Sequence, residues 1–277
     1  SDVCSSDLAE GGTVTSTLAA TDPDGSFTAA YQWQISDNGT SGWTDIASAT
    51  TDSYTIASDQ SQVGKYLRVV AVTTDGLGGH TTFTSASTVA VQNVDDAATG
   101  TLTTGGTVAE GGTVTSTLTA TDPDGSFTAA YQWQISSDGS TGWTDIVGAV
   151  TSSYTIASDQ SQVGQYLRLV VVTTDVLNGT TTFTSSATAA ITNVNDPPGG
   201  TLTISGTPTQ GQTLTLADAI TDADGLGTRS YVWKANRTAI AGATGTSIVL
   251  TQAEVGKTIT DRKSTRLNSS HGYISYA

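Results

Sequence analysis

The sequence predicts an all-β protein of tandem β-sandwich domains in a linear array, with the third domain truncated. Three observations support this fold class. The chain resembles itself at an offset of 100 residues, apolar residues alternate with polar ones, and turn-forming residues separate the alternating runs. Thr, Ser, Gly and Val dominate the composition, which favours short strands joined by tight turns.

The internal repeat is nearly exact between the first two copies. Residues 9–36 and 109–136 differ only in having Ala19 in one copy and Thr119 in the other. A period of about 100 residues is the size of one autonomous domain and is too long for a solenoid unit. Each copy can therefore bury a core of its own.

A third copy is shorter. TDADG at 221–225 keeps the offset from TDPDG at 121–125, whereas VGK at 255–257 comes eight residues early. We therefore expect the third copy to lack its last strands and to have a partly exposed core. The expected organisation is an adapter-like segment at 1–8, repeats at 9–98, 99–198 and 199–260, and an adapter-like segment at 261–277.

Within the second repeat, apolar residues recur with a period of two, which is typical of strands with one packed face. Phe183, Ser185, Ala187, Ala189 and Ile191 are expected to share one face of the last strand. Turns such as that at 122–125 separate the runs, and about seven short antiparallel strands of this kind make a β-sandwich. The runs lie at 113–121, 131–135, 154–156, 166–174 and 183–191.

A tryptophan occupies the same strand position in all three copies. Trp33, Trp133 and Trp233 have apolar neighbours at alternate positions. We expect each to anchor a core between two sheets.

The two ends do not fit the repeats. The DNA word GATCGGAAGAGCACACGTCTGA encodes DRKSTRL at 261–267, and its reverse complement encodes SDVCSSD at 1–7. One word thus accounts for both ends, as a translated sequencing adapter would. If residues 1–8 are adapter, Cys4, the only cysteine, is not part of the natural protein and contributes to neither fold nor function.

Charge and composition exclude several functions. The net charge of −15 repels phosphate backbones, so nucleic acid is not an expected partner. No run of eighteen apolar residues is available for a transmembrane segment. Outside the adapter-like ends, His80 is the only histidine and no cysteine remains, so the residues of a nucleophilic catalytic site are missing. We expect a protein that is not an enzyme.

The chain resembles the bacterial Ig-like and cadherin-like repeats of giant RTX-type adhesins. The resemblance covers residues 9–260 and rests on TATDPDG (119–125), YQWQIS (131–136), SYTIASDQSQVGQYLRLV (153–170) and VNDPPGGTLTI (194–204). It implies an extracellular or cell-surface location, a spacer or adhesion role, and calcium at domain junctions. The neighbouring repeats are its implied partners, together with host-cell or matrix ligands or glycans.

The resemblance also implies metal ligands, because calcium takes six to eight oxygen ligands, several of them from carboxylates. The candidate ligands are Glu10, Asp22, Asp24, Asp75, Asp95, Asp96, Glu110, Asp122, Asp124, Asp175, Asn195, Asp196, Asp222 and Asp224. The junctions at 93–98 and 193–198 only partly match the family's full Asp-x-Asn-Asp-Asn-x-Pro pattern. The alternative for Asp-Pro-Asp-Gly is an ordinary type I turn whose carboxylates face water.

Trp43 and Trp143 are absent from the third copy, so the fold does not require them. Either each indole lies over a sheet edge, or it is an exposed platform for sugar stacking. The second alternative makes the repeat a carbohydrate- or ligand-binding module, which could belong to a secreted hydrolase. The first fits a spacer or adhesion repeat.

Overall fold

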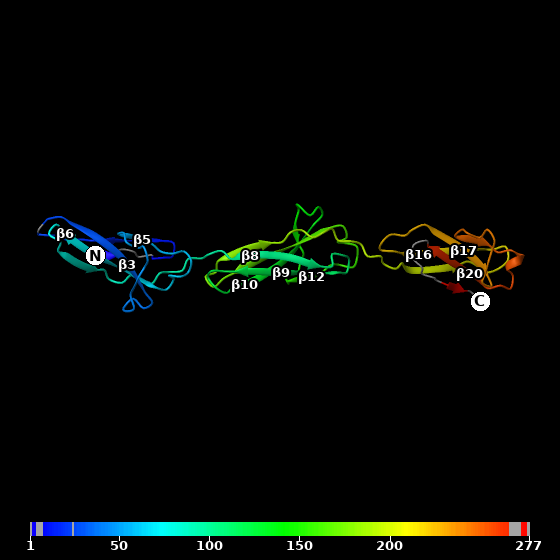
Figure 1. The fold of residues 1–277 in the computed structure, drawn as a ribbon. Helices are drawn as coiled ribbons and strands as arrows, with labels where there is room; N and C mark the ends of the chain where they lie inside the picture. The colour runs from blue at the N-terminus through cyan, green and yellow to red at the C-terminus, as the bar shows by residue number, and fades with distance from the viewer. Residues whose placement is uncertain (1, 4–7, 24, 266–272, 276–277) are drawn as a thin grey trace. The chain divides into compact units, whose positions relative to one another are not determined.

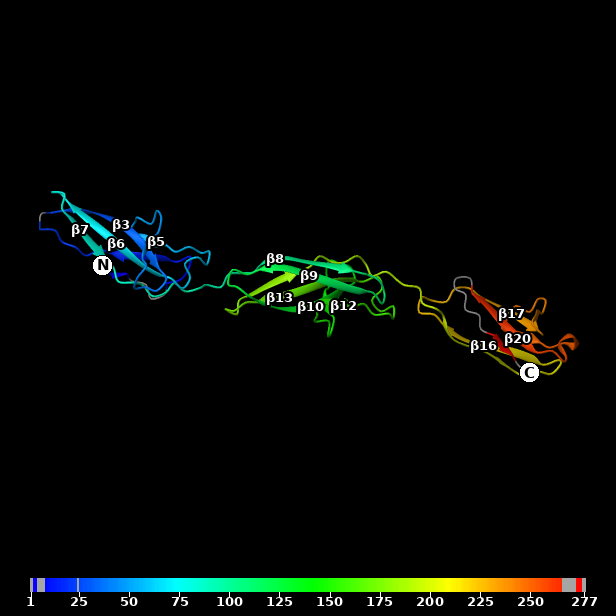
Figure 2. The ribbon, with the colours of Figure 1, turned by 60° about the horizontal axis from the view of Figure 1, so that its bottom comes forward.

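The computed structural model describes residues 2–3, 8–23, 25–265 and 273–275. Across these residues each repeat contributes one three-stranded and one four-stranded sheet (Figures 1 and 2). The regular structure is otherwise a short 3-10 helix, η1 (Gln252–Glu254). Among the described residues, no helix has the length and hydrophobicity needed to cross a membrane.

In the first repeat the sheets have the orders β1-β2-β5 and β4-β3-β6-β7. Their strands are β1 (Asp2–Val3), β2 (Thr13–Thr17), β3 (Phe27–Ser36), β4 (Thr44–Asp45), β5 (Ser53–Thr55), β6 (Tyr66–Asp75) and β7 (His80–Thr84). The longest pairing joins β3 to β6 antiparallel over their full lengths, from Phe27 opposite Asp75 to Ser36 opposite Tyr66.

The second repeat has the sheets β12-β9-β8 and β11-β10-β13-β14, and the third has β15-β16-β19 and β18-β17-β20-β21. The strands of the second repeat are β8 (Thr99–Gly106), β9 (Thr113–Thr121), β10 (Thr128–Ser136), β11 (Thr144–Asp145), β12 (Ser153–Thr155), β13 (Tyr166–Thr174) and β14 (Thr180–Thr184). Those of the third are β15 (Gly199–Ser205), β16 (Thr213–Thr221), β17 (Arg229–Ala235), β18 (Thr238–Ala239), β19 (Ser247–Val249), β20 (Ile259–Thr265) and β21 (Tyr273–Ser275).

By compactness the chain divides into two units. Residues 1–103, 117–132 and 169–185 form the first unit, and residues 104–116, 133–168 and 186–277 form the second. The four-stranded sheet of the second repeat thus contributes residues to both units.

The alternation of the sequence sets the core. In β6 and β13 every second residue is buried, as expected for a strand that packs one face against a second sheet. The predicted tryptophan anchors are confirmed, because Trp33, Trp133 and Trp233 are each 0% exposed. Each indole N–H donates to a backbone carbonyl, at 3.0, 3.0 and 2.9 Å respectively, so burial leaves no donor unsatisfied.

The prediction for the last strand of the second repeat is wrong at Ala187 and Ala189. Ala187 and Ala189 are exposed, whereas Ser185 and Ile191 are buried. The segment donates backbone N–H groups from residues 185, 188 and 191 to the carbonyls of 169, 167 and 165, so three of its residues match two on β13. An extra residue per step is a bulge, and it changes the inward period from two to three. The first repeat has the same pattern at residues 85, 88 and 91.

The described parts of both adapter-like ends join the fold, since β1 pairs with β2 and β21 pairs with β20. Leu8 is 2% exposed and lies in the first core, at the position that Val108 occupies in the second repeat. At the other end, residues 261–265 continue β20. The rest of the adapter-like ends lies largely outside the described residues.

Candidate functional site

Three carboxylates converge in the first unit. Glu10 lies before β2, near the start of the first repeat. Asp96 lies between β7 and β8, and Asp124 belongs to the turn between β9 and β10. Each offers an oxygen within 4.8 Å of the others. Glu10 is only 7% exposed, and its carboxylate accepts the Val94 N–H at 2.9 Å. Three acidic groups gathered this closely, one of them buried, repel one another unless donors or a cation neutralise them.

The Asp-Pro-Asp-Gly turn explains how Asp124 reaches this group. Gly125 donates to the Asp122 carbonyl at 3.1 Å, and the Asp122 carboxylate accepts the Asp124 N–H at 2.9 Å. Asp122 therefore closes the turn, which frees the second carboxylate. The Asp124 carboxylate accepts the Asp96 N–H at 2.7 Å. Closing the turn and offering a candidate ligand are thus two roles of one segment.

A second acidic group shares Asp124. It adds Asp95 and Asp175, again with oxygens within 4.8 Å of one another. A side-chain hydrogen bond with Asp175, desolvation, and the negative charges of Asp175 and Asp124 raise the pKa of the Asp95 carboxyl. Gly179 permits this approach, because a β-carbon there would overlap the Asp95 carboxylate.

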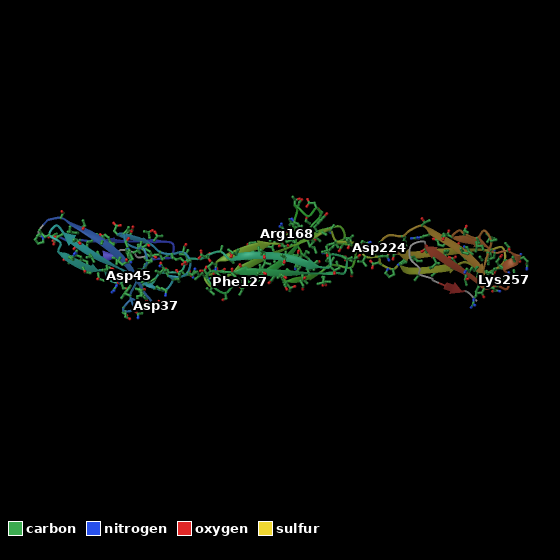
Figure 3. All side chains as sticks on the ribbon, viewed as in Figure 1. Asp37, Asp45, Phe127, Arg168, Asp224 and Lys257 are labelled. Carbon is green, nitrogen blue, oxygen red and sulfur yellow. The ribbon has the colours of Figure 1, made fainter. Side chains whose placement is uncertain are left out.

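The third group lies in the second unit and repeats the geometry of the first. It contains Glu110, which is 7% exposed, with Asp196 and Asp224, the last of which is labelled in Figure 3. Asp224 accepts from the Asp196 N–H at 2.5 Å and from the Asn193 amide at 2.7 Å. These hydrogen bonds, that of Asn193 first, lower the pKa of the Asp224 carboxyl.

Two glutamines that the sequence patterns did not predict also contact these groups. The Gln60 amide nitrogen lies within 3.0–3.3 Å of oxygens of Glu10, Asp96 and Asp124. Gln160 repeats this arrangement with Glu110 and Asp224, at 3.0 and 2.8 Å. Both glutamines have a positive φ of 64°, uncommon for a residue with a side chain. The motif SDQSQVG, identical in both copies, was the available signal.

The other candidate ligands that the structure describes do not join these groups. Asp75 instead accepts the Leu77 and Gly79 N–H groups, both at 2.8 Å. Asp222 accepts the Asp224 N–H at 3.0 Å, and the Asn195 amide donates to the Asp196 carbonyl at 3.4 Å. Asp22 closes the first repeat's turn through its carbonyl. Asp24 lies outside the described residues.

Both surplus tryptophans are half-buried and stack on arginine. The guanidinium of Arg68 lies 4.4 Å from the Trp43 ring centroid, and that of Arg168, which is labelled in Figure 3, lies 4.5 Å from the Trp143 ring centroid. Each arginine also donates to a glutamine of the neighbouring strand at 2.7 Å. The indoles thus already have a stacking partner over the sheet, and sugar binding stays a prediction.

Among solved structures, the chain is similar to an adhesin described as "Ca2+-stabilized", which "helps an Antarctic bacterium reach out and bind ice". Identity is 15%, covering 95% of this chain and 66% of that one, with a TM-score of 0.28. A 1.5-MDa bacterial ice-binding adhesin shares 14% identity over 96% of this chain and 88% of its own, at a TM-score of 0.26. Extracellular cadherin domains of protocadherin gamma B2 share 12% identity over 97% of this chain and 56% of their own, at a TM-score of 0.39.

No curated protein matches the chain. One family model matches it twice in succession, over residues 3–93 and 98–195, which together make up more than half of the sequence. The chain therefore belongs to the family described as "Domain of unknown function (DUF8696)".

Proposed function

We propose that the chain is a run of extracellular spacer or adhesion repeats from a large bacterial surface or secreted protein, stiffened by calcium at its acidic groups. The observation that carries the proposal is the convergence of Glu10, Asp96 and Asp124, repeated by Glu110, Asp196 and Asp224. In each set the glutamate lies near the start of one repeat and the first aspartate lies in the segment that ends that repeat. The second aspartate lies in the Asp-x-Asp-Gly turn of the following repeat.

The donors fit a hard cation. All members of the three groups are carboxylates, and the described residues bring no histidine or cysteine to them. Oxygen-only donor sets suit calcium, magnesium or manganese, whereas zinc and copper favour nitrogen and sulfur. The amide nitrogens of Gln60 and Gln160 donate to these carboxylates, and with the amide turned over its oxygen would be a further ligand of the kind that calcium takes.

A cation held by such a group would act mechanically. Without it, like charges repel across segments far apart in the sequence. With it, those segments are tied together, and the hinge between repeats loses freedom. The ion binds the folded arrangement and not the unfolded chain, so its binding energy adds to stability.

The test is a calcium titration of the full chain, followed by calorimetry and by limited proteolysis of residues 93–98 and 193–198. Extracellular calcium modules bind at about 10⁻⁴–10⁻³ M. At 2 mM calcium we therefore expect about 0.6–1.8 kcal/mol of stabilisation per site and slower cleavage at the junctions.

Two variants and one control sharpen the titration. Glu10→Gln should abolish the response of the first group, and Glu110→Gln that of the third. Asp52→Asn removes one charge from an exposed position outside the groups and should leave the response unchanged. An unfolding midpoint that ignores millimolar calcium, or equal responses from all three variants, would refute the proposal.

A further inference from the structure

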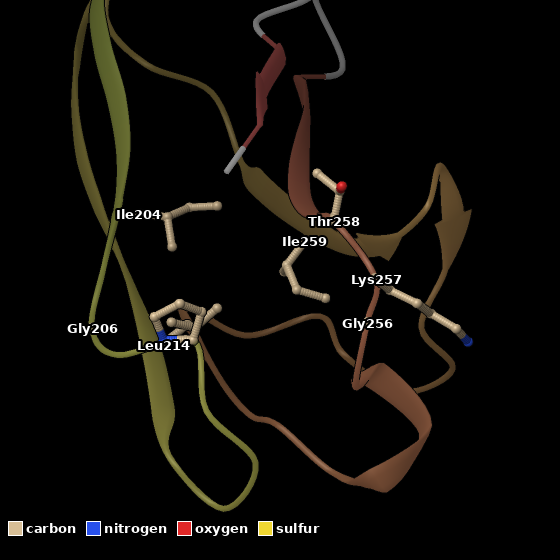
Figure 4. A pocket seen from close by; sticks show the side chains of 8 residues that line it. Ile204, Gly206, Leu214, Gly256, Lys257, Thr258 and Ile259 are labelled. Carbon is tan, nitrogen blue, oxygen red and sulfur yellow. The ribbon is translucent and has the colours of Figure 1, made fainter. Parts of the chain in front are cut away.

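The cavity beside the third core belongs to the core itself. It has a volume of about 420 Å³ and lies between Ile204 and Leu214 on one side and Ile259 on the other (Figure 4). In the second repeat Ile191, which is 2% exposed, closes the matching place. The closing segment of the third core is missing from the described residues, so the cavity does not indicate a ligand site. Reactive groups lie instead in two turns of the first and second repeats.

Each of these turns contains an asparagine followed by a glycine. Asn38 and Gly39 lie in the hairpin between β3 and β4, and Asn178 and Gly179 lie in the turn between β13 and β14. Asparagine is thermolabile, because the backbone nitrogen of the next residue can attack its side-chain amide. A following glycine has no side chain to hinder the attack. Both asparagines are exposed, so sequence and exposure alone make the two pairs equally reactive.

The folded chain holds the side chain of Asn38 in place. Its Oδ1 accepts the backbone N–H groups of Thr40 and Ser41, both at 2.9 Å, and its Nδ2 donates to the Ser41 hydroxyl at 3.0 Å. Side-chain bonds of this kind fix an asparagine against its own turn. Attack by the Gly39 nitrogen turns the amide toward that nitrogen and makes its carbon tetrahedral. These hydrogen bonds must therefore break before Asn38 reacts.

The side chain of Asn178 is free. Within the described part of the chain no hydrogen bond involves it, and only its backbone N–H is bonded, to the Asp175 carbonyl at 3.3 Å. Its φ is +71°, a left-handed conformation that asparagine tolerates in turns. The Gly179 N–H donates to Asp175 Oδ1 at 3.0 Å, so a carboxylate lies within reach of the proton that the attack releases.

The second repeat shows that an aspartate fits the place of Asn38. Asp138 occupies the same position and accepts the N–H groups of Ser140 and Thr141, at 2.8 and 2.7 Å. The Thr141 hydroxyl first, and then these N–H groups, hold the pKa of the Asp138 carboxyl well below its ordinary value. The hairpin therefore accepts an aspartate product at residue 38, and hydrogen bonding to the amide only slows its formation.

We propose that Asn178 is a site of spontaneous deamidation, whereas Asn38 is protected by its hydrogen bonds. The Gly179 nitrogen bonds to Cγ of Asn178, the bond from Cγ to Nδ2 breaks, and ammonia leaves with the proton of the Gly179 nitrogen. The product is a succinimide. Water then opens it at either carbonyl and gives aspartate or isoaspartate, with no change of oxidation state.

The reaction adds a negative charge beside the acidic group of Asp95, Asp124 and Asp175. Gly179 lies against the Asp95 carboxylate, which a β-carbon at this position would overlap, and its carbonyl accepts the Asp175 N–H at 3.1 Å. Isoaspartate also inserts one backbone carbon just before Gly179. Deamidation therefore opposes the close approach of the three carboxylates. The first repeat has glycine at residue 78, the corresponding position, and cannot react in this way.

A matched pair of variants tests this effect of charge. In calcium-free buffer of low ionic strength, Asn178→Asp should lower the midpoint of urea unfolding, and salt at about 1 M should remove the difference by screening. Asn38→Asp reproduces the residue found at Asp138 and should not lower the midpoint. If Asn178→Asp leaves the midpoint unchanged at low ionic strength, the added charge does not act on the acidic group.

The reaction itself is followed in the full chain, kept at mildly alkaline pH in water enriched in oxygen-18. Peptide mass spectrometry should find labelled aspartate and isoaspartate at residue 178. Conversion at residue 38 should be at least about tenfold slower, because two hydrogen bonds of ordinary net strength together account for a factor of that size. In urea the two pairs have the same following residue and no folded structure, so their rates should become similar.

Three results would overturn the proposal. In the folded chain, Asn38 could convert as fast as Asn178, or residue 178 could stay intact while the chain in urea reacts. The difference between the two sites could also persist in urea, which would place its cause in the local sequence. Aspartate without isoaspartate at residue 178 would exclude the succinimide and with it the attack by Gly179.

Discussion

Replacing Ile191 by alanine tests whether the segment after β14 closes the second core. Its side chain is 2% exposed, so the alanine would leave a cavity in the second core. Truncating a buried isoleucine to alanine costs about 2–5 kcal/mol, and the lower half of this range applies where surroundings can collapse. The segment lies at the margin of the core, so we expect about 2–3 kcal/mol of local destabilisation.

Hydrogen exchange resolves this effect to one repeat. Lowering the free energy of local opening by 1.4 kcal/mol raises the exchange rate about tenfold. Amides of β13 should therefore exchange about 30- to 150-fold faster in Ile191→Ala. Amides of β6 in the first repeat serve as an internal reference and should not change. Val194→Ala is the matched control, since its side chain is 48% exposed on the same segment. If both variants exchange alike in β13, the segment does not hold the core and the reasoning fails.

Three further predictions concern the site and its surroundings. Asp95→Asn replaces the acid by the residue found at Asn195. Because the folded-state pKa of Asp95 is raised, the folded chain binds the proton more tightly than the unfolded one, and stability falls as pH rises above the ordinary aspartate pKa of about 3.9. The variant should flatten this fall in calcium-free buffer, as measured by urea unfolding from pH 3 to 7, and an unchanged slope would contradict the assignment. Trp143→Ala removes the contact with Arg168 and should cost the second repeat about 0.5–1 kcal/mol, as cation–π pairs at exposed sites do. A glycan array run on the same variant separates this packing role from sugar stacking, because only the latter predicts lost binding. Gly139→Ala puts a β-carbon 2.8 Å from the Tyr166 ring at a φ of +71°, whereas Gly142→Ala, at a φ of +62°, meets no atom within 4 Å. Gly139→Ala should lower the unfolding midpoint further than Gly142→Ala, and equal midpoints would show that the ring yields.

The site was predicted only in part, for a physical reason. Glu10, Asp96 and Asp124 were candidates because of their residue type, but so were Asp22, Asp75 and Asp222, which have other roles. Sequence alone cannot tell which carboxylate of an Asp-Pro-Asp-Gly turn closes the turn and which is released. Gln60 and Gln160 escaped notice because an amide carries no charge and the residues lie 50 positions from their glutamates.

The sequence by itself determined the all-β class, the repeat, the buried tryptophans and most strands, because strand alternation and turn chemistry are local properties of the chain. Only the tertiary structure decided which carboxylates meet and which face the segment after β14 presents. These depend on the register between segments distant in sequence. One bulged residue moves a side chain from solvent to core without leaving any mark in the local pattern.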